Sequence, residues 1–200
     1  MTVEGWYKSL DNLVVRPLSG VSEQNNDGTG WAGGVDINVT KRLSRKIHGQ
    51  IGYSFLKSKR DDHDGRGEYD FAFEQTHQVN FLIGYKPSSR WILSAKFRYA
   101  TGKPTSSYIV HADVFDNPNY MRYSQEIVGK NDLQLGDFVV LDVRTDYRFQ
   151  VHRLGLSAFL DIANINNRLN ENRRLFNPIH GRTFVDGLAI FPTFGLKFEY

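Results

Sequence analysis

The chain has 200 residues, no cysteine, a formal net charge of +3 and a mean hydropathy of -0.45. The lack of cysteine excludes disulfides, thiolate catalysis and cysteine-ligated metals, and the charge is too small to indicate a nucleic-acid partner. No apolar stretch approaches the roughly 20 residues that a membrane-spanning helix needs.

A hydrophobic period of two, which is typical of strands with one apolar face, runs along most of the chain. In chain order the predicted strands are Val3–Arg16, Trp31–Val39, Ile47–Phe55, Thr76–Tyr85, Trp91–Ala100, Phe138–Phe149, Leu154–Ile162 and Pro192–Tyr200. The first strand has the weakest pattern. The clearest is Trp91–Ala100, in which apolar Leu93 and Phe97 alternate with Lys96 and Arg98.

The connections between these strands alternate in length. The short turns are Lys41–Lys46, Lys86–Arg90 and Gln150–Arg153, and the long loops are Pro17–Thr29, Leu56–Phe71, Thr101–Leu135 and Asn164–Leu188. This alternation is typical of bacterial outer-membrane barrels, which have short periplasmic turns and long extracellular loops. The prediction is an all-β fold, an antiparallel transmembrane β-barrel of about eight up-and-down strands, spanning residues 1–200 as one domain.

Two questions stay open at this stage. The eight strands could close as a small barrel or form part of a larger one. A soluble β-sandwich or a lipocalin-like barrel would show the same alternation with the polar face turned outward. Strictly alternating loop lengths and aromatic residues near the ends of the apolar faces favour the membrane barrel.

The C-terminal strand has the most informative pattern. Its apolar face consists of Phe194, Leu196, Phe198 and Tyr200, and the sequence stops on the aromatic residue. Domain ends are usually frayed and polar, so this face is expected to meet lipid. It also resembles the C-terminal signal that the bacterial barrel-assembly machinery reads.

Two groups of residues are candidates for ligand contact. Exposed aromatic and arginine side chains anchor many interfaces, and the long loop at 101–135 carries Tyr108, Tyr120, Arg122 and Tyr123. The alternative for these is packing within the loop. A charge ladder on the polar strand faces, expected in the lumen, consists of Lys96, Arg98, Asp142, Arg144, Asp146 and Arg148. It could guide a ligand or form structural cross-strand salt bridges.

The remaining polar clusters do not indicate catalysis or a cofactor. The acidic run Asp61–Asp64 lacks the spaced ligands of a calcium loop, so a solvated loop is expected and no metal is predicted. Glu74 and His77 lie near a mouth of the predicted barrel and could serve a proton or metal role, but the expectation is that His77 is a satisfied histidine in the lumen. His63, His111 and His180 lie in predicted loops, and His111 lies near Ser106, Ser107 and Asp113 in sequence. No nucleophile elbow, zinc motif or phosphate loop accompanies them, so the chain is predicted not to be an enzyme.

An ordered set of segments resembles the C-terminal barrel of TonB-dependent outer-membrane receptors. The segments are EGWYKSLDNLVVRP (Glu4–Pro17), FEQTHQVN (Phe73–Asn80), FRYATGKP (Phe97–Pro104), LDVRTDYRF (Leu141–Phe149), FLDIANINNR (Phe159–Arg168) and GLAIFPTFGLKFEY (Gly187–Tyr200). The resemblance implies a barrel of about 22 strands around an N-terminal plug that this sequence does not contain. About fourteen strands would then also lie elsewhere.

The same resemblance implies location in the bacterial outer membrane and uptake of a scarce ligand such as an iron–siderophore complex, cobalamin or a saccharide. The implied partners are outer-membrane lipid, the barrel-assembly machinery, and a plug domain or further strands on another chain. The alternative function is that of a small standalone barrel with a structural, adhesive or lipid-modifying role.

Overall fold

The computed structural model describes residues 1–15, 24–44, 46–114, 121–152, 154–187 and 189–199, and all regular elements there are strands. They are β1 (Thr2–Val15), β2 (Asn25–Ser44), β3 (Ile47–Asp61), β4 (Tyr69–Asp70), β5 (His77–Tyr85), β6 (Trp91–Ala100), β7 (Pro104–Val114), β8 (Met121–Gln134), β9 (Phe138–Val151), β10 (Leu154–Ala163), β11 (Arg173–Asn177), β12 (Arg182–Asp186) and β13 (Phe191–Glu199). No helix among these residues is long and apolar enough to cross a membrane.

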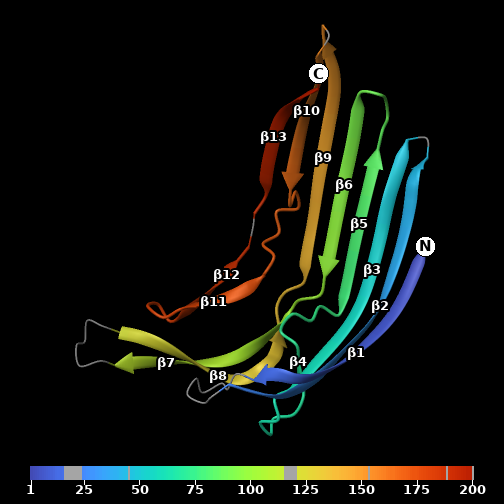
Figure 1. Cartoon of the computed structure of the whole chain (residues 1–200). Helices are drawn as coiled ribbons and strands as arrows, with labels where there is room; N and C mark the ends of the chain where they lie inside the picture. The colour runs from blue at the N-terminus through green and yellow to red at the C-terminus, as the bar shows by residue number, and fades with distance from the viewer. Residues whose placement is uncertain (16–23, 45, 115–120, 153, 188, 200) are drawn as a thin grey trace.

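Eight of the strands form one curved antiparallel sheet in the order β1-β2-β3-β5-β6-β9-β10-β13, with the short β4 beside β3. Neighbours in the sheet are therefore neighbours in sequence, apart from the inserted pieces. Two separate hairpins, β7–β8 and β11–β12, lie at the end of the sheet where the long connections are, at the bottom of Figure 1. The predicted all-β, antiparallel, up-and-down arrangement is confirmed.

The eight predicted strands coincide with the eight strands of the sheet. β6 has the predicted bounds, and the turn between β5 and β6 is Lys86–Arg90, as predicted. The agreement follows from the period of two, because each strand has one apolar face and a local pattern suffices to detect it. The turn between β9 and β10 contains His152 at φ 56°, a left-handed conformation that tight turns use.

The four connections predicted as long loops all contain strand residues, so this part of the prediction was wrong. β2 begins at Asn25, β3 continues to Asp61, and the two hairpins lie within Thr101–Leu135 and Asn164–Leu188. The reason is that strands continuing beyond the apolar face are polar on both sides, as in the Lys57–Arg60 stretch of β3. Hydrophobicity then no longer alternates, although the backbone ladder continues.

The sheet is open. β1 and β13 end the strand order, no ladder joins them within the described part of the chain, and they lie on opposite sides of the sheet in Figure 1. The sequence allows the eight strands to close as a small barrel, but the structure does not show such a closed barrel. The curvature of eight strands does not bring the two edges within hydrogen-bonding distance, so both edges keep unpaired backbone groups.

The described part of the chain has almost no buried apolar core. The buried hydrophobic side chains among the described residues are Val15, Ala100, Leu135 and Val140, and no large side chain there is fully buried. Instead, large apolar side chains along the sheet are exposed, including Ile51, Leu93 and Leu160. A soluble domain of this size would bury most of such surface.

Candidate functional site

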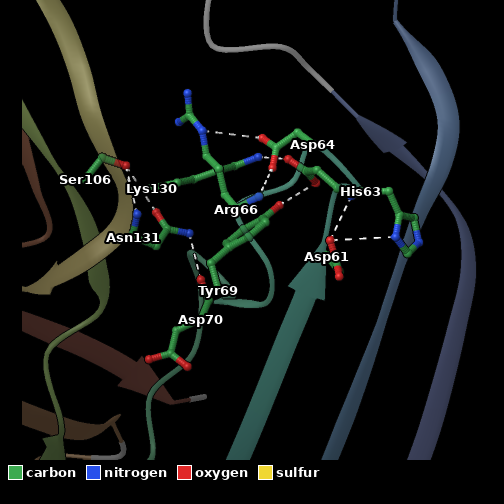
Figure 2. A network of polar contacts seen from close by, with 10 residues as sticks. Asp61, His63, Asp64, Arg66, Tyr69, Asp70, Ser106, Lys130 and Asn131 are labelled. Atoms are coloured by element: carbon green, nitrogen blue, oxygen red, sulfur yellow. Dashed lines mark hydrogen bonds and ion pairs between the residues drawn. The ribbon is translucent and has the colours of Figure 1, made fainter.

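A polar network at the loop end joins the β3–β4 connection to the β7–β8 hairpin (Figure 2). The Asp62 carboxylate accepts a hydrogen bond from the Tyr69 hydroxyl at 2.8 Å and forms an ion pair with the Lys130 ammonium. The Lys130 ammonium also lies 4.3 Å from the centroid of the Tyr69 ring. The Asp62 side chain is only 8% exposed and that of Lys130 21% exposed, so the pair is largely shielded from solvent.

Asn131 forms the second link in this network. Its side-chain amide donates to the Asp70 carbonyl at 2.8 Å, and its backbone N–H donates to the Ser106 hydroxyl at 3.1 Å. Figure 2 shows Asn131 between Ser106 and the strand of Asp70. Asn131 has φ 52°, a conformation that asparagine tolerates better than most residues. The two segments, about sixty positions apart in sequence, are thus held together by polar contacts rather than by an apolar core.

The acidic run Asp61–Asp64 is engaged in turn geometry rather than open for a cation. Asp61 accepts the backbone N–H of His63 at 2.8 Å, and Asp64 accepts the backbone N–H of Arg66 at 3.0 Å. The His63 ring contacts the Thr29 hydroxyl at 3.1 Å. No group of three or more His, Cys, Asp or Glu residues that could hold a metal occurs among the described residues.

Burial changes the proton affinities inside this network. Burial raises the pKa of the Tyr69 phenol, which favours its neutral, hydrogen-bond-donating form beside Asp62. Burial also lowers the pKa of the Lys130 ammonium, and the nearby Arg60 guanidinium adds repulsion. Both pKa shifts result from burial, which agrees with a structural role for Tyr69 and Lys130 in joining the two loops.

Glu74 forms a second buried centre, directly before β5. Its side chain is 2% exposed and accepts three hydrogen bonds, from Lys57 Nζ at 2.5 Å, from the Ser58 backbone N–H at 2.8 Å and from the Thr76 hydroxyl at 3.1 Å. The hydrogen bond to Glu74 is the main cause that raises the pKa of Lys57. His77 is also engaged, because its Nδ1 lies 2.9 Å from the Tyr53 hydroxyl. The expected position on the polar, lumen side was wrong, because the register sets His77 opposite Phe55 on the apolar face of the sheet.

The structure places three of the four predicted ligand-contact residues, Tyr108, Arg122 and Tyr123, in the β7–β8 hairpin, and two of these contact the segment that contains β11 and β12. The Tyr108 hydroxyl hydrogen-bonds with Thr183, and its ring meets Phe176 edge-on at 6.3 Å. The Tyr123 backbone N–H donates to the Pro178 carbonyl at 2.8 Å. These contacts hold the hairpin against β11–β12. Arg122 is exposed, and Tyr120 lies outside the described residues.

The charge ladder is only partly joined into ion pairs. Arg144 binds Asp146 at 2.8 Å and Asp161 at 3.4 Å, and Arg98 lies 3.8 Å from Asp142. The register sets Lys96 opposite Asp142, while Arg148 is tied in through its backbone N–H, which donates to the Arg90 carbonyl at 2.8 Å. Neither of these two side chains forms an ion pair with a described residue.

Arg98 also borders a hollow on the polar face of the sheet. The hollow has a volume of about 590 Å³ and is bounded by strands β6 and β9 on one side and by the segment from Asn164 to Phe191 on the other. Arg98 Nε is buried and has no hydrogen-bond partner within the described part of the chain, and its guanidinium lies 5.4 Å from the Phe138 ring centroid. Small-molecule sites have this size and this mixture of apolar wall and few polar groups.

Asparagine side chains after β10 hydrogen-bond the part of β9 that has no β10 partner, a role that the sequence did not predict. Asn170 accepts from the Val139 N–H at 2.7 Å and donates to the Val139 carbonyl at 3.1 Å. Asn166 accepts from the Leu141 N–H at 3.0 Å. These side chains take the place of the backbone hydrogen-bond partners that β10 supplies to β9 from Val143 onward. The signal in the sequence is the spacing of asparagines directly after a strand, since amides both donate and accept.

The C-terminal residues lie on the edge strand β13. Phe194 is 84% exposed, Leu196 62% and Phe198 64%, and the three share one face. They lie opposite Leu160, Ala158 and Leu156 of β10 in the register. Tyr200, the fourth residue of the predicted assembly signal, lies outside the described residues.

The residues considered for catalysis are not brought together. His111 Nε2 lies 2.8 Å from Glu126, the Ser107 hydroxyl donates to Asp132 at 2.6 Å, and the Ser124 hydroxyl donates to Asp113. Each pair is a separate cross-strand contact of the β7–β8 hairpin.

Comparisons with known proteins do not assign the chain to a family. No protein-family model matches the chain, and no curated protein matches it. The functional conclusion therefore depends on the geometry described above.

Proposed function

We propose that this chain forms part of the wall of a bacterial outer-membrane β-barrel of the TonB-dependent receptor type, which takes up a scarce ligand such as an iron–siderophore complex. The observation that carries the proposal is the register of the sheet. It aligns one row of side chains across six strands: Ile47, Tyr85, Leu93, Thr145, Leu160 and Phe194. Further rows of the same character run beside it, so a single apolar face extends over the sheet.

The chemistry of this face is suited to lipid. Aromatic side chains gather toward both of its limits. At the short-turn limit Trp91 and Tyr147 lie 4.7 Å apart between ring centroids, and at the loop limit are Tyr53 and Tyr99. The eight steps from Trp91 to Tyr99 cover about 27 Å along the strand at about 3.4 Å per residue. With the usual strand tilt, this is close to the apolar band of an outer-membrane barrel.

The opposite face of the sheet is polar and internally bonded, as a lumen wall would be. The Trp6 indole N–H donates to Asp36 at 3.0 Å, and Ser54 donates to the same carboxylate. Arg144 and its two carboxylate partners lie on this side, as does the hollow at Arg98. In a lipid bilayer such groups must be satisfied away from the hydrocarbon. The polar face is thus the side on which a ligand would pass.

The two open edges favour a larger barrel over a standalone one. Lipid does not tolerate unpaired sheet edges, and β1 and β13 end the strand order without pairing with each other. Additional strands would close the wall, which agrees with the resemblance to receptors with about 22 strands.

Single-cysteine labelling tests the membrane placement, because the chain contains no cysteine of its own. We would introduce cysteine at Ile51 or Leu93 on the apolar face and at Gln50 or Ser94 on the polar face, attach bimane, and refold the protein into bilayers with brominated lipid. Strong quenching is expected at the apolar-face positions only. Equal quenching at neighbouring positions, or no association with lipid, would overturn the proposal.

Heat-modifiable gel mobility then separates the two barrel types. A compact, fast-migrating unheated band for the 200-residue chain in micelles would indicate a closed small barrel. Its absence, together with lipid quenching on one face, would indicate a section of a larger wall.

A further inference from the structure

Two of the short turns, between β2 and β3 and between β5 and β6, carry a group of cations and lie in stretches of sequence that contain no acidic residue. The residues Lys41, Arg42, Lys46, Lys86 and Arg90, which we call the basic rim, lie in or beside the turns between β2 and β3 and between β5 and β6. Residues 37–60 and 75–112 contain neither aspartate nor glutamate. The loop end is different, because two of its lysines, Lys57 and Lys130, are paired with buried carboxylates.

The fold holds the two turns of the basic rim side by side. The Lys86 backbone N–H donates to the Lys46 carbonyl at 2.8 Å. Lys41, opposite Gly49, lies on the apolar side of the sheet, and Lys86, next to Tyr85, lies on the other side. The cations therefore surround the turn end from both faces.

These cations have no counter-charge within the described part of the protein. None of the five forms an ion pair with a described residue. An open hollow of about 460 Å³ between the turns is lined by Lys41, Arg42, His48 and Lys86, among other residues, and by no carboxylate. His48 Nδ1 is buried there and has no hydrogen-bond partner among the described residues. The basic rim can therefore bind an anion from outside the chain.

The position of the rim relative to the apolar face identifies the anion. Tyr85, Trp91 and Tyr147 end the apolar face immediately beside it. Aromatic belts lie at the headgroup level of a membrane, and cations just beyond an apolar surface attract the phosphates of anionic lipids. We propose that the basic rim binds the phosphate groups of anionic phospholipid in the leaflet that the short turns face. This inference rests on the proposed membrane placement.

The test is lipid selectivity measured with spin-labelled lipids. The full chain is reconstituted into phosphatidylcholine bilayers, and the motionally restricted signal of labelled phosphatidylglycerol is compared with that of labelled phosphatidylcholine. We expect a preference of about fivefold for phosphatidylglycerol, the effect of about one fully engaged cation at a membrane surface. Salt should reduce the preference, because the contact is electrostatic.

Three variants make the result specific. K41Q/K46Q/K86Q should bring the preference close to one, and K41R/K46R/K86R should retain it. The charge-matched control K8Q/K59Q/K103Q, which leaves the rim intact, should also retain it. Circular dichroism verifies the strand content of each variant.

Each outcome is decisive. Wild-type protein that restricts both lipids equally, or K41Q/K46Q/K86Q protein that keeps the full preference, would overturn the inference while the membrane placement stands. If the control K8Q/K59Q/K103Q loses as much preference as K41Q/K46Q/K86Q, the effect is one of net charge, and this would also overturn the inference. If neither lipid is restricted, the proposed function itself fails.

Discussion

Replacing Glu74 by alanine should open the structure locally around the start of β5. The side chain is 2% exposed and accepts from Lys57, the Ser58 N–H and Thr76. Loss of the carboxylate leaves the N–H of buried Ser58 without a partner, which costs about 1–3 kcal/mol. The Lys57 side chain is 39% exposed, so its ammonium regains water and the lost ion pair adds at most about 1 kcal/mol.

The expected total is therefore about 1–4 kcal/mol of local opening free energy. Amide hydrogen exchange measures this quantity directly, and a loss of 2 kcal/mol corresponds to an exchange rate at Ser58 that is about 30-fold faster. Glu74→Gln should have a smaller effect, because its amide oxygen can still accept from the Ser58 N–H. The control is Glu68→Gln, at an exposed carboxylate. Unchanged protection at Ser58 in Glu74→Ala would refute the reasoning.

Three further predictions concern other parts of the chain. The hydrogen bonds from Ser107 lower the pKa of Asp132, so their stabilising effect is present above the ordinary aspartate pKa and is lost as the pH falls through the depressed one; carboxyl-carbon NMR of Ser107→Ala should show the Asp132 pKa moving upward. Gly181→Ala should cost about 1–2 kcal/mol in amide exchange of the β11–β12 hairpin, because Gly181 has φ +59° and a Cβ there would lie 2.8 Å from the Tyr123 ring. Phe81→Arg, on the apolar face, should destabilise the protein in a bilayer by about 2–4 kcal/mol in urea unfolding.

Matched controls are present in the same chain. Gly67→Ala also places alanine at positive φ (+77°) but has nothing within 4 Å of the new Cβ, so it separates backbone strain from the ring clash. Asn80→Arg adds the same charge to the polar face beside Phe81 and should cost far less. An unmoved Asp132 titration in Ser107→Ala, equal effects of the two glycine variants, or equal effects of the two arginine variants would contradict the respective reasoning.

The Arg98 region illustrates how far sequence reasoning reached for the candidate site. Alternation in β6 and β9 was enough to place Arg98 and Asp142 on the same face, and the structure has them 3.8 Å apart. The hollow beside them was not predictable, because one of its sides is the returning segment from Asn164 to Phe191. That segment has no periodic pattern, and its position depends on amide contacts such as those from Asn170 to Val139.

The contacts of Tyr108 and Tyr123 in the β7–β8 hairpin were also not predictable from the sequence. For Tyr108 and Tyr123 the sequence predicts either contact with a ligand or packing within the loop at 101–135. In the structure the Tyr108 ring packs against Phe176, and the Tyr123 backbone N–H donates to the Pro178 carbonyl, so the partners lie in the 164–188 segment and not in the same loop. Sequence distance of more than fifty residues separates these partners, so no local pattern could pair them.

The sequence by itself determined the strands of the main sheet, their order and which face of each is apolar, because side chains alternate with a period of two and each strand carries that pattern locally. Only the tertiary structure decided where the strands extend beyond the apolar face, how Asp62 and Lys130 join two distant loops, and that β1 and β13 do not meet. Those features depend on contacts between residues far apart in the chain and on the accumulated curvature of eight strands, which no single segment of the sequence encodes.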